Sequence, residues 1–406
     1  MVQVKLVRSL LNLSRSLDFS SKGLMCHHQR VAYIALSLGQ EVGLQENNLF
    51  DLFKASIIHD AGALSWREKL VLERFDVQNP WNHCKQGSAF VADIPTFSSL
   101  APVILSHHDA WAGNNYSGYK RDQIPLLSRI IHLADRVDVL LKEGVYVLEQ
   151  RDKIMKRIQA LSGQVFDPDL VALLTDLSRR ESFWLDLNSP WLNERLESLI
   201  PTTQVNVETE DLLHLGKLFA RVVDMRSPFT YRHSNGVSLV GRFLAESMGF
   251  SHEEVELIQV AGLLHDLGKL AIPEAIIEKR GPLTKAEMNL MKQHTYYTYW
   301  LLKPITLPFP IPEWAAFHHE RLDGQGYPFH KSATDLDTPA RLLAVADIYT
   351  ALREERPYRS SLSEVEIKRI LKAKVADGGL DQKIIEHLLA SYYAINNLWA
   401  QLSAPL

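Results

Sequence analysis

The residues of this 406-residue chain with the clearest chemistry are ten of its 16 histidines, which fall into two copies of one pattern. The second copy consists of His233, His265, Asp266, His294, His318, His319 and Asp347, and the first of His27, His59, Asp60, His83, His107, His108 and Asp135. The isolated histidine precedes the His-Asp pair by 32 residues in both copies, and the middle histidine precedes the His-His pair by 24 in both. Imidazole and carboxylate groups are ligands of Fe, Mn, Zn and similar ions. Because matched spacing marks a repeated structural unit, we interpret the two sets as metal-ligand constellations in a duplicated domain.

Seven candidate ligands in one copy are more than a single ion needs, since three to six protein ligands usually suffice. The second copy therefore predicts a site for two divalent metal ions. Adjacent side chains of a helix point about 100° apart. His265 and Asp266 can therefore bind different ions only if one of the two side chains bridges both ions or the helix ends at this pair. The carboxylate is the natural bridge between two cations.

The elements that must position these residues are predicted to be helices, because apolar residues recur at helical spacing in both halves and strand signals are nearly absent. Capping boxes at 251–254 and 284–287 open two of these helices. We expect the first to end at His265-Asp266, with Gly268 providing the exit, and the second to carry His294. A loop rich in proline, 304–312, should lead into the helix that bears the His-His pair.

The domain organisation follows from the repeat, whose copies are offset by 206 to 212 residues. Periodicity fades between residues 186 and 207, so we place the boundary near 200, with one domain at 1–195 and the other at 206–406. A net charge of −4 argues against polymeric nucleic acid as a partner. No apolar run of 18 residues occurs, which excludes membrane insertion, and two cysteines give no disulfide framework. We therefore expect a soluble protein of the cytoplasm.

Residues 210–400 resemble the HD-GYP family of bacterial signalling phosphodiesterases. The resemblance depends on HDLGKLAIPEAII at 265–277, HHERLDGQGYP at 318–328 and RLLAVADIYTALREERPYR at 341–359. Residues 1–180 look like a diverged HD domain of the same ancestry. The resemblance implies an all-α fold of tandem HD-superfamily domains, a degenerate HD followed by HD-GYP. Members of this family hydrolyse cyclic dinucleotides, principally cyclic di-GMP and in some cases 3′3′-cGAMP. It thus implies a metal-dependent phosphodiesterase that opens a 3′-5′ phosphodiester of such a second messenger to the linear dinucleotide.

The resemblance also assigns roles to individual residues. The seven second-copy ligands would surround two divalent ions, with Fe or Mn favoured over Ni, Mg or others. Asp266 and Lys269 would act in catalysis, with Lys269 on the scissile phosphate. The residues expected to bind substrate are Lys269, Arg321, Gly324, Gly326, Tyr327, Arg356 and Arg359.

Three positions of the second copy depart from the family's pattern. Phe229 stands where some members carry a Glu that binds a third metal, so two metals are expected. Ser227 and Thr350 stand where aspartates near the substrate are frequent. We therefore expect this chain to differ from the family in how a proton reaches the leaving oxygen and in which nucleobases of the substrate it prefers.

The first copy keeps all seven ligand residue types, which makes it a candidate second metal site. It lacks the residues that are expected to bind the phosphate group in the second copy. Ala63 replaces the lysine, 113–117 replaces the GYP loop, and the RPYR stretch has no counterpart. A hydrolase needs contacts to the transition state as well as bound metal. We therefore expect a regulatory or dimer-forming module rather than a second active site.

Four functions remain open at this stage. The leading hypothesis is the phosphodiesterase, and the alternative is a catalytically weak sensor that binds a cyclic dinucleotide and signals to a protein partner, with the GYP loop as the contact. A hydrolase acting on a mononucleotide or an alarmone and a di-iron oxygenase are two further alternatives. Retained Lys269, Arg356 and Arg359 favour phosphate chemistry over the oxygenase. A homodimer is also compatible with the helical stretch at 136–160.

Overall fold

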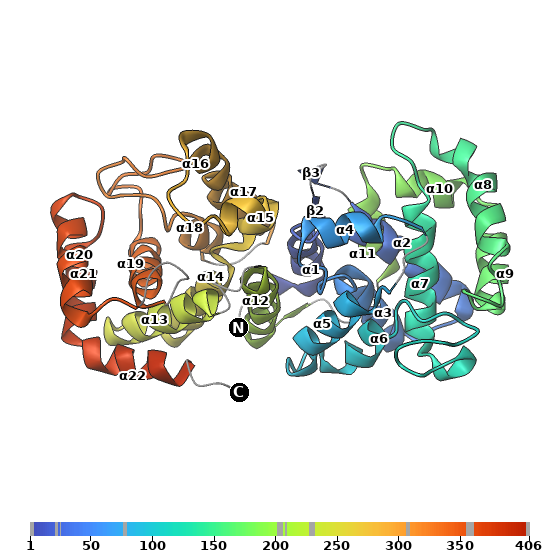
Figure 1. The fold of residues 1–406 in the computed structure, drawn as a ribbon, viewed down its shortest axis with the longest axis horizontal. Coiled ribbons are helices and arrows are strands. Elements are labelled where there is room, and N and C mark those ends of the chain that lie inside the picture. Colours follow the sequence, from blue (N-terminus) through green and yellow to red (C-terminus); the bar gives the residue numbers. More distant parts are fainter. Residues whose placement is uncertain are drawn as a thin grey trace. The chain divides into compact units, whose positions relative to one another are not determined.

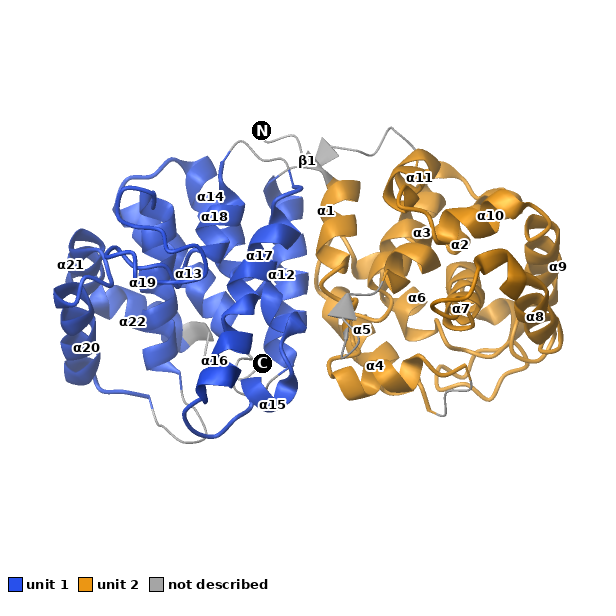
Figure 2. Ribbon diagram, turned by 90° about the horizontal axis from the view of Figure 1, so that it is seen from above, with its two compact units in different colours: residues 1–5, 207–406 blue, residues 6–206 orange. Residues whose placement is uncertain are grey.

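A computed structural model of the chain describes residues 4–20, 23–24, 26–75, 79–200, 206–207, 209–226, 232–305, 309–354 and 361–402. Four residues singled out above, Ser227, Phe229, Arg356 and Arg359, lie outside these ranges. The chain forms two compact units: an N-terminal unit of residues 6–206 and a C-terminal unit of residues 207–406 with 1–5. Figure 2 colours the N-terminal unit orange and the C-terminal unit blue.

The described part of the N-terminal unit consists of helices joined by turns and loops, with one short hairpin of strands β2 (Phe19–Ser20) and β3 (Gly23–Leu24). Its helices are α1 (Leu6–Ser14), α2 (His27–Val42), α3 (Glu46–Ile58), α4 (Trp66–Leu72), α5 (Trp81–Ala92), α6 (Ala101–Leu105), α7 (Leu126–Val139), α8 (Val147–Gln159), α9 (Pro168–Leu177), α10 (Glu181–Leu187) and α11 (Leu192–Leu199). Short 3₁₀ turns η1 (Ser98–Leu100) and η2 (Arg121–Gln123) join them.

The C-terminal unit repeats this construction. Its helices are α12 (Thr209–Met225), α13 (His233–Ser247), α14 (His252–Leu264), α15 (Glu274–Ile277), α16 (Lys285–Met291), α17 (Gln293–Leu302), α18 (Ile311–Ala316), α19 (Thr338–Arg353), α20 (Glu364–Ala376), α21 (Gln382–Ala390) and α22 (Tyr392–Leu402). A 3₁₀ turn, η4 (Leu267–Ala271), follows α14, and strand β1 (Val4–Lys5) pairs with β4 (Asn206–Val207).

Equivalent helices form the core of each unit. In the C-terminal unit α13 packs against α14 and α19 (Figure 1), and in the N-terminal unit α2 packs against α3 and α7. The apolar residues at helical spacing supply the contacts, as with Val237 and Leu244 on α13, both fully buried. The prediction of an all-α fold is confirmed. None of the described helices combines the length and apolar character that crossing a bilayer requires.

The local predictions around the ligands are mostly confirmed, with corrections at three helix ends. Both capping boxes, 251–254 and 284–287, are present. Helix α16 stops at Met291, however, so His294 belongs to a separate helix, α17. Helix α18 stops at Ala316, before the His-His pair.

Gly268 is the third correction, because it does not cap α14. The helix already ends at Leu264, and Gly268 does not adopt the positive φ of a glycine cap. A Cβ on Gly268 would lie 1.9 Å from the carbonyl oxygen of His294, so a glycine is needed for η4 to pass against α17. In the N-terminal unit, a Cβ on Gly62 would lie 2.1 Å from the carbonyl oxygen of His83. The same close approach therefore recurs in both units.

Candidate metal centres

The seven second-copy residues come together in the C-terminal unit, where we call them the C-terminal cluster. They are supplied by the first residue of α13, the end of α14, the first turn of α17, the residues after α18 and the middle of α19. All except His319 are buried. Three groups of their ligand atoms lie close enough together to hold a metal ion: His233, His265 and Asp347; His265, Asp266 and His318; and His294, His318 and His319.

Asp266 divides this cluster into two halves. Its Oδ2 lies 3.2 Å from Nε2 of His265 and 3.6 Å from Nε2 of His233. Its Oδ1 lies 3.5 Å from Nε2 of His294 and 4.0 Å from Nε2 of His318. One carboxylate oxygen thus faces each pair of imidazoles, which is the geometry of a carboxylate placed to bridge two cations.

Hydrogen bonds fix which nitrogen each imidazole presents to the cluster. Nδ1 of His265, His294 and His318 lies 2.6–2.7 Å from the backbone carbonyl three residues earlier. Since a carbonyl only accepts, Nδ1 carries the proton and Nε2 turns its lone pair inward. Nδ1 of His233 lies 3.0 Å from Oε1 of Glu354 instead. Such outer partners set the tautomer and orientation of metal-binding histidines.

The electrostatics of the buried groups fit cations. Burial lowers the pKa of His294 to about 3 and that of His318 well below its ordinary value, so both rings are neutral. Their Nε2 atoms nevertheless face each other at 3.4 Å. Two lone pairs directed at one space repel unless a cation lies between them, and ligands at metal distances of about 2.0–2.1 Å would stand at roughly this separation. The donor set therefore fits a bound metal.

The carboxylates of the cluster are held ionised. Burial alone would raise the pKa of Asp266, but its interactions with the His265 imidazole and the Lys269 cation outweigh burial and lower this pKa well below its usual range. Burial is likewise outweighed at Asp347, where the hydrogen bond and charge of His233 lower the pKa. Ionised carboxylates are the form that binds metal.

The seven first-copy residues form an N-terminal cluster with the same arrangement. Oδ2 of Asp60 lies 3.5 Å from Nε2 of His59 and 3.8 Å from Nε2 of His27. Its Oδ1 lies 3.1 Å from Nε2 of His83 and 3.4 Å from Nε2 of His107. Asp135 joins the half that contains His27, and His108 joins the half that contains His83. Each carboxylate oxygen thus faces the same two ligand positions as in the C-terminal cluster.

A sequence profile described as HD domain matches residues 12–170 and 217–384, most of the chain and both clusters. The chain belongs to the HD domain family. Its relatives confirm the resemblance to the HD-GYP branch: the 3′3′-cGAMP-specific phosphodiesterase 1 of Vibrio cholerae is 31% identical over 97% of this chain and 94% of its own length. Phosphodiesterase 3 of that organism, also 3′3′-cGAMP-specific, is 27% identical over 87% of both chains.

Two further comparisons concern a partial match and the fold. The cyclic di-GMP phosphodiesterase response regulator RpfG of Xanthomonas campestris is 38% identical over 41% of this chain and 44% of its own. A solved structure of a cyclic GMP-AMP specific phosphodiesterase of Vibrio cholerae (V-cGAP3) superposes with a TM-score of 0.66 at 24% identity, covering 96% of this chain and 98% of that one. This structural likeness shows that the two chains share a fold.

The catalytic residues expected of the C-terminal HD domain lie together. Nζ of Lys269 is 2.5 Å from Oδ2 of Asp266, so the lysine lies against the carboxylate that divides the cluster. Tyr327 lies over His319, with ring centroids 5.0 Å apart, and its backbone N–H donates to the carbonyl of His319. Tyr327 of the GYP loop (326–328) thus lies beside His319, the one ligand of the cluster that is not fully buried.

The other loop residues expected to bind substrate shape the loop instead of entering the cluster. Arg321 donates to both Asp323 and Asp377. Gly324 adopts a positive φ of 73°, and a Cβ on Gly326 would lie 2.4 Å from Cα of Glu320. The structure therefore brings Lys269 and Tyr327 to the cluster but not Arg321.

Sequence reasoning missed the residues that support the ligands. Glu354 orients His233, and Oγ1 of Thr298 accepts from the N–H of Gly268 and donates to the carbonyl of His265. Glu354 directly follows the last residue of α19 and comes seven residues, or two helical turns, after Asp347, so its place at the end of the ligand-bearing face was a usable signal. Thr350, at the position of the family's frequent aspartate, is fully buried, and its Oγ1 has no hydrogen-bond partner.

Proposed function

We propose that this chain is a metal-dependent phosphodiesterase that hydrolyses a 3′-5′ phosphodiester of a cyclic dinucleotide to the linear dinucleotide. The observation that carries the proposal is the placement of Asp266 between two sets of imidazoles, with Lys269 against its outer edge. The relatives support the substrate class, and the one matching nearly the whole chain is named for 3′3′-cGAMP. We therefore expect 3′3′-cGAMP to be the better substrate and cyclic di-GMP the alternative.

The proposed cofactors are two divalent ions in the C-terminal cluster, Fe or Mn by preference. The first would take His233, His265, Asp266 and Asp347, and the second would take Asp266, His294, His318 and His319. Mixed imidazole and carboxylate ligands suit these ions, while Ni or Mg remain testable substitutes. When bound, such a pair supplies an activated water for attack on phosphorus and polarises the phosphoryl oxygens.

The chain's own residues supply the rest of the mechanism. The buried carbonyls that accept from Nδ1 keep His265, His294 and His318 from reorienting, so their Nε2 atoms stay preorganised. Lys269 places a positive charge where a non-bridging phosphoryl oxygen becomes more negative in the transition state. Tyr327 offers an aromatic face beside His319, where it can limit access of water and contact a base.

The experiment compares hydrolysis of 3′3′-cGAMP and cyclic di-GMP by full-length protein loaded with Mn or Fe. The variant His265→Ala/Asp266→Ala should abolish turnover. His252→Ala is the matched control, because His252 lies on the same helix with an 84% exposed side chain and should retain turnover. No turnover of either compound by metal-replete wild type would refute the proposal. Binding without cleavage would instead favour the sensor.

We assign the catalytic role to residues 206–406 and a regulatory role to residues 1–195. A homodimer, a protein partner at the GYP loop and a cytoplasmic location are further predictions. Size-exclusion chromatography with light scattering tests the first of these directly.

A further inference from the structure

We propose that Arg226 is a positioning residue of the C-terminal HD domain, which holds the backbone of Lys269 so that the lysine ammonium stays against Asp266. This inference rests on the proposed function, because the place of Lys269 matters for turnover only if the site cleaves a phosphodiester. In this proposal Arg226 acts through Lys269 and makes no contact with the substrate.

Arg226 directly follows α12, and its guanidinium connects two other segments of the C-terminal HD domain. Nη1 donates to the backbone carbonyl of Lys269 across 2.8 Å, and Nη2 pairs with Oε1 of Glu274 across 2.7 Å. The side chain of Arg226 is only 2% exposed. Arginine suits such a place because its planar fork donates in two directions at once and keeps its charge when buried. One buried side chain therefore ties the end of α12 to the turn η4 and to the start of α15.

The backbone of Lys269 is held at both of its polar groups. Its N–H donates to the carbonyl of Asp266 across 2.8 Å, and its carbonyl accepts from the N–H of Ile272 across 2.9 Å as well as from Arg226. The first two bonds are local bonds of a 3₁₀ turn, which have poorer geometry than those of an α-helix. The bond from Arg226 comes from outside the turn, so it fixes the turn relative to α12 and keeps Nζ of Lys269 at Oδ2 of Asp266.

The end of α12 also supports the first metal ligand, His233. Asp224 lies two residues before Arg226 and is buried. Its Oδ2 accepts from the N–H of Ser234 across 3.0 Å, and its Oδ1 accepts from the hydroxyl of Ser234 across 2.7 Å. Ser234 directly follows His233 in the first turn of α13. One short segment therefore holds both the turn that bears a ligand and the turn that bears the lysine.

The N-terminal unit offers an internal comparison, because it keeps the carboxylates of this arrangement and lacks both cations. At an offset of 206 residues, the equivalent pairs are Asp18 and Asp224, Ser20 and Arg226, Ala63 and Lys269, and Glu68 and Glu274. Asp18 still accepts from the N–H of His28, the residue after the ligand His27. The arginine is thus missing from the copy whose turn carries no lysine, as expected if its purpose is to hold that lysine.

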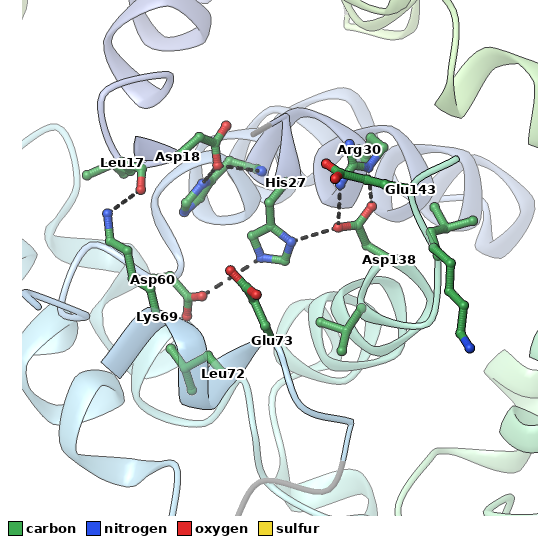
Figure 3. A pocket seen from close by; sticks show the side chains of 14 residues that line it. Leu17, Asp18, His27, Arg30, Asp60, Lys69, Leu72, Glu73, Asp138 and Glu143 are labelled. Carbon is green, nitrogen blue, oxygen red and sulfur yellow. Dashed lines mark hydrogen bonds and ion pairs between the residues drawn. The ribbon is translucent and has the colours of Figure 1, made fainter. Parts of the chain in front are cut away.

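A structural link between the same two segments does not require an arginine at this position. In the N-terminal unit Lys69 of α4, the helix equivalent to α15, donates to the carbonyls of Leu17 and Phe19, which follow α1 (Figure 3). There the cation comes from the helix, and the turn after the His-Asp pair takes no part in these bonds. What Arg226 adds in the C-terminal HD domain is the bond to the carbonyl of Lys269.

The first test is the kcat of Arg226→Met for 3′3′-cGAMP, in full-length protein loaded with Mn. Methionine fills irregular buried space without a charge, and an apolar side chain in place of a buried ion pair is often tolerated. Glu274 has a 26% exposed side chain, so water can solvate it once Arg226 is gone. We expect kcat to fall on the order of tenfold with bound Mn unchanged, because the lysine is present but no longer held in place.

The matched control is Arg242→Met. This arginine also pairs with a glutamate, Glu246, but the two side chains are 47% and 50% exposed, so kcat should stay at the wild-type value. Arg226→Lys keeps a positive charge on a single-point donor that cannot bond the carbonyl and Glu274 together, so it should recover only part of the lost kcat. Wild-type kcat in Arg226→Met would overturn the proposal.

A double-mutant cycle separates positioning from a general loss of structure. In the Lys269→Met background, Arg226→Met should change kcat by less than about twofold, because no ammonium remains to be held. Equal fold losses in the two backgrounds would overturn the proposal, since Arg226 would then act on something other than Lys269.

Hydrogen exchange tests the same contact without turnover. Amides of residues 267–272 should exchange faster in Arg226→Met than in the wild type, measured by mass spectrometry with α20 as the internal reference. Unchanged exchange in this segment would overturn the proposal. If the metal-loaded wild type hydrolyses no cyclic dinucleotide, the phosphodiesterase proposal fails, and the exchange experiment still decides whether Arg226 holds the turn.

Discussion

Replacing Gly268 by alanine should damage the C-terminal metal centre through the backbone alone. The added Cβ would lie 1.9 Å from the carbonyl oxygen and 2.8 Å from the carbonyl carbon of His294, while real Cβ contacts stay beyond 3.0 Å. The turn η4 and helix α17 must therefore separate by about 1 Å or more, and overpacking of this kind costs about 1–3 kcal/mol. This separation would move Oδ1 of Asp266 away from Nε2 of His294, which lies 3.5 Å from it in the wild type. A displacement of about 1 Å can reduce a reaction rate about 100-fold.

The assay measures bound Mn, turnover of 3′3′-cGAMP and the thermal unfolding midpoint of Gly268→Ala. The matched control is Gly249→Ala, whose φ of 82° makes alanine costly but whose Cβ would meet nothing within 4 Å. We expect Gly249→Ala to lose about 1–2 kcal/mol of stability and Gly268→Ala about 1–3 kcal/mol, with only Gly268→Ala also losing metal and activity. A Gly268→Ala protein with full metal content and wild-type turnover would refute the reasoning.

Three further predictions concern single side chains of the C-terminal HD domain. Lys269→Met should lower kcat on the order of 100-fold while the metal content stays unchanged, because the lysine stabilises charge and is not a ligand. Lys269→Arg, which keeps the positive charge, is the conservative control. Equal kcat values for the Met and Arg variants in steady-state kinetics would contradict this prediction. Glu354 and Asp347 overcome burial and raise the pKa of His233 to about 10 in the metal-free protein, so a proton competes with metal and affinity should rise as pH increases towards that value. Glu354→Gln should flatten the increase in Mn affinity between pH 7 and 9, and an unchanged slope in competition titrations would be evidence against it. Gly326→Ala should raise KM about tenfold with metal content intact, because the added Cβ would collide with Glu320 and displace the GYP loop. A fall in kcat alone, measured by steady-state kinetics, would contradict this prediction.

The sequence was sufficient for the all-α fold because its apolar spacing and capping boxes are local signals. The duplication could also be predicted, since the same intervals of 32 and 24 residues separate ligand histidines in both halves of the sequence. Helix ends near the ligands were less predictable: the break between α16 and α17 carries no glycine or proline, so the periodicity runs on through His294. The role of Gly268 depends on a contact with α17 that only the tertiary structure contains.

The outer partners of the ligands could not be predicted by comparing the two copies position by position. The carboxylate that pairs with the first histidine comes from a different position in each copy. Each must hold Nδ1 of its first histidine. The N-terminal HD domain uses Asp138, three residues after Asp135, and the C-terminal HD domain uses Glu354, seven residues after Asp347. Residues three and seven positions along a helix share a face, so either carboxylate can reach the imidazole. The longer reach of a glutamate from one turn further leaves position 350 free for Thr350, which is buried and makes no hydrogen bond through Oγ1. The threonine at this position therefore does not show that support for the metal site was lost, because Glu354, one turn further along the chain and directly after α19, supplies that support.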